Sequence, residues 1–511
     1  MPAGILHVHG NAGWCLCESP LLGGITRWVS ASLSRRSSLR GAGSVAAGVV
    51  DSGDMRDSMR AQKRATPAAA DEPPPPSTPV ANSGSENAVL FRDVRIFDGV
   101  TPSLSASSHV LVHGNVIQQI VGRPVTPPRG TLVIDGGGRT LMPGLIDAHA
   151  HTMFAGIPLL DLLTADIGYI NLVAAKVCHD MLVRGFTSVR DMQGPVFGLK
   201  RAVDARVMPG PRIFPSGAMI SQTSGHGDFR MLAELPRNPA APLSQGEIQG
   251  ASAIADGVDD VLRAAREQLM RGASQLKLAG GGGVASNYGQ LDVTQYSEAE
   301  IRAAVGAADD WNTYVAIHAY TPRAIQRALA AGVRSIEHGH LADDATAKLM
   351  AEKDIWWSLQ PFTADFPVKF PAGSPNALKL QEVQAGTDTA YELAKKYNVK
   401  TAWGTDILFD AAAVAFQNTA LVNMTRWYAP AEVLKMATAD NAELLALSGP
   451  RNPYPGTLGV VQPSALADLL LVDGDPLQDL SLLGDPEKNL LVVMKDGQLY
   501  KQASAVTAAR A

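Results

Sequence analysis

The sequence is short of cysteines, of long apolar runs and of net charge. Three cysteines in 511 residues cannot supply a framework of disulfides, so cysteine usage does not indicate the compartment. No stretch of about 18 apolar residues is free of charged residues, which argues against a membrane-spanning helix. A formal net charge of -5 argues against nucleic acid or an anionic membrane surface as a partner. The 46% of hydrophobic residues predicts instead a globular protein with a large core.

Residues 1–86 have a composition that cannot bury much apolar surface, with Ser- and Arg-rich stretches and four consecutive prolines at Pro73–Pro76. We interpret this segment as a disordered tail or a targeting segment. Arg35 and Arg36, followed by the Gly- and Ala-rich stretch Gly41–Val50, resemble a twin-arginine export signal. The apolar stretch is short for such a signal, so a cytoplasmic location is favoured and export stays open.

Short apolar runs bounded by turn residues mark both ends of the remaining chain. On the N-terminal side, the turn at residues 113–115 (HGN) joins two strand-like segments, and on the C-terminal side Asp496-Gly497 does the same. Two such all-β pieces at opposite ends of a long α/β stretch predict one small β-sandwich domain. We expect this domain to be assembled from residues 87–144 and 456–503.

Between these pieces, in residues 145–455, apolar strands alternate with segments whose apolar residues recur every three or four positions, as in amphipathic helices. This alternation favours a parallel sheet, and eight such units favour a closed (β/α)8 barrel of the TIM type. An open doubly wound sheet is the alternative that the pattern alone leaves open. The predicted strands lie at 145–147, 188–190, 213–215, 276–278, 315–317, 335–337, 357–359 and 401–403.

Side chains that bind metals lie at the ends of five of these strands. His149 and His151 follow the first strand with one residue between them, so both imidazoles point to the same side of an extended chain. Taken singly, each residue of the set has an ordinary explanation, such as a hydrogen-bonded histidine, a paired lysine or a turn aspartate. In a barrel, however, the strand ends converge on one face, and the coincidence predicts a metal centre. The other members are Lys277 on the fourth strand, His318 on the fifth, His338 on the sixth and Asp406 after the eighth.

Four motifs connect these residues to a known family. The segment Leu141–His151, LMPGLIDAHAH, resembles the entry motif of the amidohydrolase superfamily. Lys277, His318, SIEHG at 335–339 and GTD at 404–406 then follow in the order of that family. The resemblance covers about 88–503. Within the superfamily, the sequence is most similar to the Xaa-Pro and related C-terminal amino acid dipeptidases and to the ochratoxinases.

The resemblance implies two divalent metal ions, usually zinc, bridged by Lys277 as an N-carboxylated side chain. A free ammonium here would repel two cations, whereas a carbamate supplies two anionic oxygens. Asp406 and His338 are the expected catalytic residues; Asp406 accepts the proton of the attacking water and returns it to the leaving amine. The remaining ligands divide between the ions, the first held by His149, His151 and Asp406 and the second by His318 and His338.

We therefore expect a binuclear metal-dependent amide hydrolase that releases a C-terminal amino acid from dipeptides or N-acyl amino acids, with ochratoxin A-type amides among the candidate substrates. A cyclic amide or amidine hydrolase, or a deaminase, on the same barrel is the alternative. Lys277 argues against it, because those relatives typically use one metal without this lysine. The intact ligand set argues against a barrel kept only as a non-enzymatic scaffold. The resemblance also implies a homo-oligomer, with octamers frequent among the relatives.

Three residues outside the metal set are candidate substrate contacts. His226 lies between glycines in the loop after the third strand, where an imidazole could touch a carbonyl oxygen or a carboxylate; a loop histidine without a role is the alternative. Tyr288 lies beyond the glycine-rich loop of the fourth strand, and Arg190 ends the second strand. The fifth strand carries His318 and Tyr320 where related dipeptidases often carry two histidines, and this departure leaves the exact substrate open.

Overall fold

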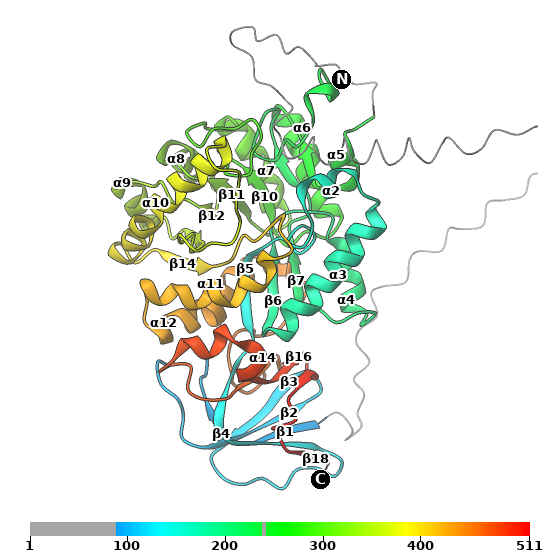
Figure 1. Ribbon diagram of the computed structural model, residues 1–511, viewed down its shortest axis with the longest axis vertical. Helices are drawn as coiled ribbons and strands as arrows, with labels where there is room; N and C mark the ends of the chain where they lie inside the picture. Colours follow the sequence, from blue (N-terminus) through cyan, green and yellow to red (C-terminus); the bar gives the residue numbers. More distant parts are fainter. Residues whose placement is uncertain (1–87, 238–241, 511) are drawn as a thin grey trace, which may run out of the picture. The chain divides into compact units, whose positions relative to one another are not determined.

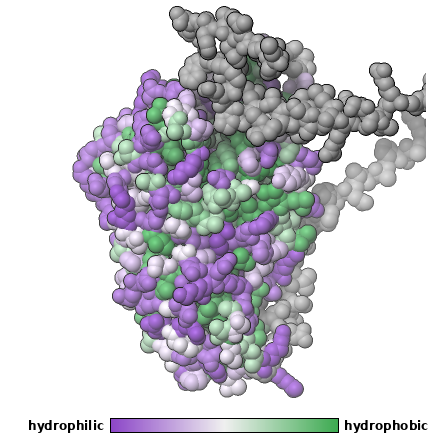
Figure 2. All heavy atoms as spheres, viewed as in Figure 1, coloured by the Kyte–Doolittle hydropathy of each residue, from purple (hydrophilic) through white to green (hydrophobic). Residues whose placement is uncertain are grey.

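The computed structural model describes residues 88–237 and 242–510 (Figure 1). The predicted tail and its twin-arginine-like pair lie outside the described residues. Hydrophilic side chains cover much of the face seen in Figure 2, with hydrophobic ones in patches between them. Within the described chain, no helix is long and apolar enough to cross a membrane.

A ring of short parallel strands forms the TIM-barrel-like α/β fold, and all eight predicted strands are present in it. The third predicted strand is β7, which pairs with β6. Two strands that were not predicted follow it: β8, which pairs with β10, and β9, which pairs with β8. The ring closes where β14 meets β5, and there the backbone N–H of Asp406 donates to the carbonyl of His149 at 2.8 Å. The strands are β5 Leu145–Ala150, β6 Phe186–Asp191, β7 Arg212–Pro215, β8 Met219–Ser221, β9 Ser252–Ile254, β10 Leu276–Ala279, β11 Val315–Ala319, β12 Ser335–His338, β13 Trp356–Leu359 and β14 Lys400–Trp403.

Helices cover the outside of the ring (Figure 1). Their starts follow from local sequence: Ser297 caps α7 by accepting from the N–H of Glu300, whose carboxylate accepts from the N–H of Ser297. Pro322 occupies the first turn of α8, where its missing N–H costs nothing. The α-helices are α2 Leu159–Thr164, α3 Ile167–Val183, α4 Phe197–Asp204, α5 Gln245–Gln249, α6 Val258–Met270, α7 Glu298–Asp310, α8 Pro322–Ala331, α9 Asp344–Glu352, α10 Pro375–Lys396, α11 Gln417–Asn423, α12 Pro430–Lys435, α13 Asn441–Ala446 and α14 Pro486–Asn489.

Strands from both ends of the described chain form one further sheet, which Figure 1 shows in blue and red. Its order is β17-β16-β15-β4-β1-β2-β3, and β18 pairs with β4. Because these strands belong to one hydrogen-bonded sheet, the two-layered sandwich stays a prediction. Strand β18 lies beyond residue 503, where the domain was predicted to end. The strands are β1 Ala88–Ile96, β2 Ser108–His113, β3 Val116–Val121, β4 Leu132–Pro143, β15 Leu469–Val472, β16 Leu490–Lys495, β17 Gln498–Gln502 and β18 Ala508–Arg510.

A buried ion pair joins this sheet to the barrel. Arg212, at the start of β7, donates to both carboxylate oxygens of Asp468 at 2.8 and 3.1 Å and to Asp496 at 3.0 Å. The side chains of Arg212 and Asp468 are 7% and 2% exposed. Although burial lowers the pKa of Arg212, the two carboxylates raise it overall. The barrel and the sheet therefore share a charged contact from which solvent is excluded.

We expect the Arg212→Met substitution to lower the free energy of unfolding by about 3–5 kcal/mol, because it leaves the Asp468 carboxylate buried without its partner. Urea-induced unfolding measures the change. Arg263→Met is the matched control: its ion pair with Glu267 is half exposed and should contribute less than about 1 kcal/mol. Equal destabilisation by the two variants would contradict the role given to Arg212.

Candidate active site at the carboxyl ends of the barrel strands

The structure brings the predicted ligand set together at one end of the barrel. A single cavity is lined by His149, His151, Lys277, His318, His338 and Asp406. Two of these residues, His338 and Asp406, have backbone φ angles of +70° and +53°. Non-glycine residues seldom adopt this left-handed region, and such strain is concentrated at functional sites.

Asp406 lies at the centre of the histidines. Its Oδ1 is 2.9 Å from His151 Nε2 and 3.4 Å from His149 Nε2, and its Oδ2 is 3.8 Å from His338 Nδ1. Gly404 makes this approach possible, since a Cβ at that position would lie 2.5 Å from the backbone nitrogen of His149. The close contact between β14 and β5 therefore places the carboxylate against the imidazoles.

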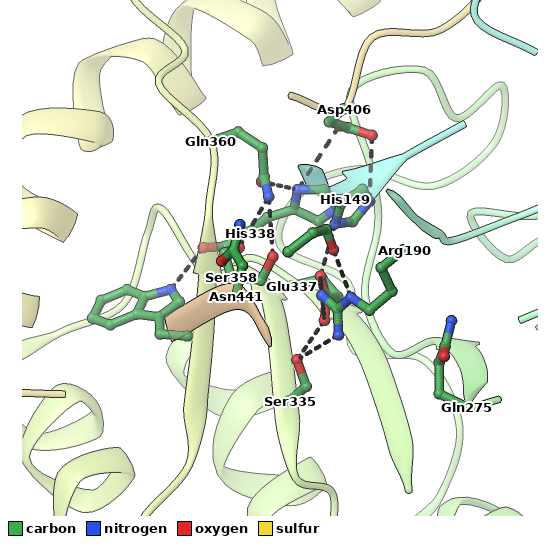
Figure 3. A network of polar contacts seen from close by, with 12 residues as sticks. His149, Arg190, Gln275, Ser335, Glu337, His338, Ser358, Gln360, Asp406 and Asn441 are labelled. Atoms are coloured by element: carbon green, nitrogen blue, oxygen red, sulfur yellow. Dashed lines mark hydrogen bonds and ion pairs between the residues drawn. The ribbon is translucent and has the colours of Figure 1, made fainter. Parts of the chain in front are cut away.

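Hydrogen bonds to buried acceptors fix the orientation of two imidazoles (Figure 3). A carboxylate can only accept, so His149 Nδ1–H donates to Glu337 Oε2 at 2.7 Å. His338 Nδ1–H donates to Gln360 Oε1 at 2.7 Å, and the Gln360 amide is oriented by its own donation to the carbonyl of Ser358 at 3.1 Å. In each ring the proton is therefore on Nδ1, and Nε2 keeps its lone pair.

His318 is oriented the other way round. Its Nε2–H donates to the carbonyl of Gly282 at 2.9 Å, which leaves Nδ1 with the lone pair. Burial first, and then neighbouring cationic groups that include Lys277, hold the pKa values of His149, His318 and His338 well below the usual range. The three rings are therefore neutral at physiological pH and available as ligands.

Several of these atoms fit a divalent cation. His149, His338 and Asp406 each offer one ligand atom, and these atoms lie within 4.8 Å of one another. His149 Nε2 is buried without a hydrogen-bond partner and faces the Asp406 carboxylate. Two electron-rich atoms facing each other in a buried site are stabilised by a cation between them, and imidazole with carboxylate is a donor set typical of zinc. The residues therefore fit the ion that the sequence predicts.

Lys277 on β10 is 2% exposed and lines the same cavity. Among the described residues it forms neither a hydrogen bond nor an ion pair within 4.0 Å. Burial lowers its pKa to about 8, against the opposing effect of Glu337 and Asp406. A buried amine without a partner in the described chain is costly as an ammonium, so this side chain is suited to a modified or neutral form.

The three predicted substrate contacts have different outcomes. His226 lines the cavity and stacks on His318 with ring centroids 3.9 Å apart; burial lowers its pKa to about 3, and its Nδ1 is buried without a partner. Tyr288 is not among the described residues that line the cavity, and its hydroxyl donates to the carbonyl of Arg230 at 2.6 Å. Its contact with a substrate stays a prediction.

The prediction for Arg190 is wrong. Its side chain is fully buried beneath the histidines, where it donates to both carboxylate oxygens of Glu337 at 2.9 and 2.7 Å (Figure 3). Its Nε donates to the carbonyl of Ala148 at 2.5 Å. The guanidinium thus makes its hydrogen bonds to groups inside the protein. Arg190 supports the site from below and does not reach a substrate.

Sequence reasoning assigned no role to three residues of the site. Glu337 holds His149, Gln360 holds His338, and the ring of Tyr320 lines the cavity while its hydroxyl has no hydrogen bond within the described chain. A signal for Glu337 was present, because a glutamate inside an apolar strand needs a buried partner. For Gln360 no local signal exists, since its partner lies 22 residues earlier on another strand.

Besides the histidines, Lys277 and Asp406, the cavity has a wall of largely apolar side chains. A substrate that enters would therefore place a hydrophobic group against this wall, with its polar centre at Asp406 and the histidines. The main apolar side chains are Phe229, Phe362, Phe366, Phe370, Leu408 and Phe409.

A TIM-barrel-like fold whose strand ends gather histidines, a lysine and an aspartate is an arrangement suited to metal-assisted hydrolysis. Residues 140–500 match the amidohydrolase family. The ochratoxinase of Aspergillus niger is 33% identical over 393 residues, which cover 71% of this chain and 75% of that protein. The chain belongs to the amidohydrolase family, as predicted, and is a hydrolase that acts on amide bonds.

Two solved structures resemble the described fold closely. A prolidase complexed with N-methylphosphonate-L-proline has a TM-score of 0.74 and 36% identity, and the alignment covers 81% of this chain and 100% of that one. An Xaa-Pro dipeptidase with bound methionine in the active site has a TM-score of 0.69 and 27% identity, with 81% and 100% covered. These likenesses confirm the predicted branch of the superfamily and argue against a non-enzymatic scaffold.

We expect Glu337→Gln to lower the free energy of unfolding by about 3–5 kcal/mol, since Arg190 loses its buried counter-charge. We also expect roughly 10- to 100-fold weaker binding of Zn²⁺, because a neutral amide no longer raises the basicity of His149. Thermal unfolding and zinc titration measure the two effects. Glu352→Gln, at an exposed glutamate on α9, is the control. Unchanged zinc affinity in folded Glu337→Gln would contradict the positioning role.

Proposed function

We propose that the chain is a binuclear metal-dependent hydrolase that releases a C-terminal amino acid from dipeptides or N-acyl amino acids. The observation that carries this proposal is the buried pairing of imidazole nitrogens that keep their lone pairs with a central carboxylate, beside Lys277, which has no hydrogen-bond or ion-pair partner among the described residues. The names of the relatives, an ochratoxinase and two proline-type peptidases, support a substrate with an amide next to a free carboxylate. Ochratoxin A-type amides are therefore candidate substrates.

In this proposal the ligands divide as the resemblance implies. Lys277 would react as the neutral amine with carbon dioxide: a new N–C bond forms, one proton leaves, and the carbamate would offer two anionic oxygens to the ions. Bound divalent cations, with zinc expected, polarise the scissile carbonyl and lower the pKa of a water molecule. The first ion is assigned to His149 Nε2, His151 and Asp406, and the second to His318 Nδ1 and His338 Nε2.

The remaining chemistry belongs to side chains of the cavity. Asp406 takes the proton from the attacking water at a carboxylate oxygen and passes it to the leaving nitrogen. The free hydroxyl of Tyr320 donates to the carbonyl oxygen as negative charge develops there. His226 lines the cavity and is the candidate contact for the substrate carboxylate. A homo-oligomeric assembly and the cellular location stay predictions.

The alternative, a cyclic amide or amidine hydrolase or a deaminase, is less well supported. Relatives of that kind typically need one ion and no lysine on the fourth strand, whereas here Lys277 lines the cavity. The apolar wall and the position of His226 also suit an open-chain substrate with a hydrophobic group and a carboxylate.

Metal analysis tests the binuclear centre. Purified protein should hold about two divalent ions per chain, and Lys277→Ala should lose bound metal and activity together, because the bridging carbamate is gone. Short carboxylic acids should partly restore both. Lys353→Ala, at an exposed lysine, should change neither quantity. A fully active, fully loaded Lys277→Ala protein would rule out the bridge.

A matched pair of substrates tests the carboxylate. An N-acyl-L-phenylalanine and its C-terminal amide should differ at least about tenfold in kcat/KM, which corresponds to about 1.4 kcal/mol of transition-state stabilisation. His226→Ala should lose a similar factor on the acid, keep its metal content, and lose much less on the amide. Equal hydrolysis of acid and amide by the parent enzyme would instead favour the cyclic amide class.

A further inference from the structure

A buried lysine outside the ligand set connects the helix α10 to the loop that follows β10. Lys379 is 6% exposed, and its Nζ donates to the carbonyls of Gly283, Ser286 and Gly289 at 3.1, 2.8 and 3.1 Å. Within the described chain it has no carboxylate partner within 4.0 Å. An ammonium has three donors, and all three are used on one loop.

The loop that Lys379 holds, residues 280–290, forms part of the active site. The carbonyl of Gly282 accepts from His318 Nε2, which fixes the ring orientation of that histidine. Gly283 packs on the His226 ring so closely that a Cβ there would lie 2.2 Å from His226 Nδ1. Val284 and the residue after it line the cavity. One loop therefore contacts a candidate ligand, a candidate substrate contact and the substrate space.

Backbone hydrogen bonds hold the start of the loop, from the N–H of Gly280 to the carbonyl of His318 at 2.8 Å and from the N–H of Gly282 to the carbonyl of Val293 at 3.3 Å, and the Tyr288 hydroxyl ties the loop to Arg230. The loop depends on Lys379 for the carbonyls of its middle part, residues 283–289. It is rich in glycine, which offers no side chain for packing, and glycine has the largest conformational entropy to lose on ordering. Asn376, one turn before Lys379 on α10, adds a donor to the carbonyl of Val284 at 2.5 Å. The next residue after Lys379, Leu380, lines the cavity itself. Helix α10 thus supplies both the anchor and a part of the wall.

We propose that Lys379 is a positioning residue, which holds the 280–290 loop against His318 and His226 and so sets the shape of the substrate space. The expected change in kinetics rests on the proposed amide hydrolase function. The expected loosening of the loop does not depend on that function. Lys379 acts through the loop and touches no reacting atom. Its loss should therefore weaken substrate binding more than it slows the chemical step.

The test compares Lys379→Met with the parent protein. Methionine has a similar length and keeps the packing, but it removes all three donors. We expect faster amide hydrogen exchange in peptides covering 280–290, a KM for an N-acyl-L-amino acid raised by about fivefold or more, and a kcat changed by less than about twofold. Metal content should stay at the parent level. Lys379→Arg, which keeps the charge and several donors, should restore part of the exchange protection and of the KM.

The matched control is Lys396→Met, since Lys396 lies at the far end of the same helix and pairs with Asp344 at the surface. It should leave loop exchange and KM unchanged. If Lys379→Met does not fold, Asn376→Ala provides a milder loss of the same anchor and should shift exchange and KM in the same direction. Parent-like exchange and KM in Lys379→Met would overturn the proposal. An inactive parent enzyme would instead count against the proposed function, while the exchange comparison still decides whether Lys379 holds the loop.

Discussion

The active site depends on one buried carboxylate, that of Glu337. It accepts from His149 on one side and from the Arg190 guanidinium on the other, and Ser335 donates to it at 2.6 Å. A lone carboxylate at this depth would be very costly, so the arginine makes the charge tolerable and the charge in turn orients the imidazole. The geometry of the histidines above is thus set by an ion pair that no solvent or substrate reaches.

A second buried acid, Asp147, performs a comparable task at the seam of the barrel. Its Oδ1 accepts from the backbone N–H groups of His149 and Thr405, and its Oδ2 accepts from the Thr405 hydroxyl and from Gln417. Burial raises the pKa of Asp147 in spite of these four donors. By tying the end of β5 to the end of β14, it holds Asp406 in register with the histidines. The same contacts therefore close the barrel and set the geometry of the site.

The strand ends could be predicted from the sequence because the signal is local: an apolar run followed by a polar residue occupies a few positions. The ligand set followed from the barrel, which forces those ends together. Arg190 could not be placed in this way, since its partner Glu337 lies 147 residues further on and only the packed structure shows that the two meet. Lys379 could not be singled out for the same reason, because the carbonyls that it binds lie 90 to 96 residues earlier in the chain. The additional strand β8, which follows Gly217 with its φ of +75°, likewise depends on partners distant in sequence, β9 and β10.

The terminal sheet has a consequence for the order in which the chain can fold on the ribosome. Strand β4 pairs with β1 from its own end of the sequence, but its other neighbours are β15 and β18, which are synthesised last. Until those residues emerge, the nascent chain presents β4 with an unpaired hydrogen-bonding edge while the barrel strands that follow are already being made. Thr140 reaches its partner Val472 only after more than 300 intervening residues have been added, so the last strands complete a sheet begun by the first.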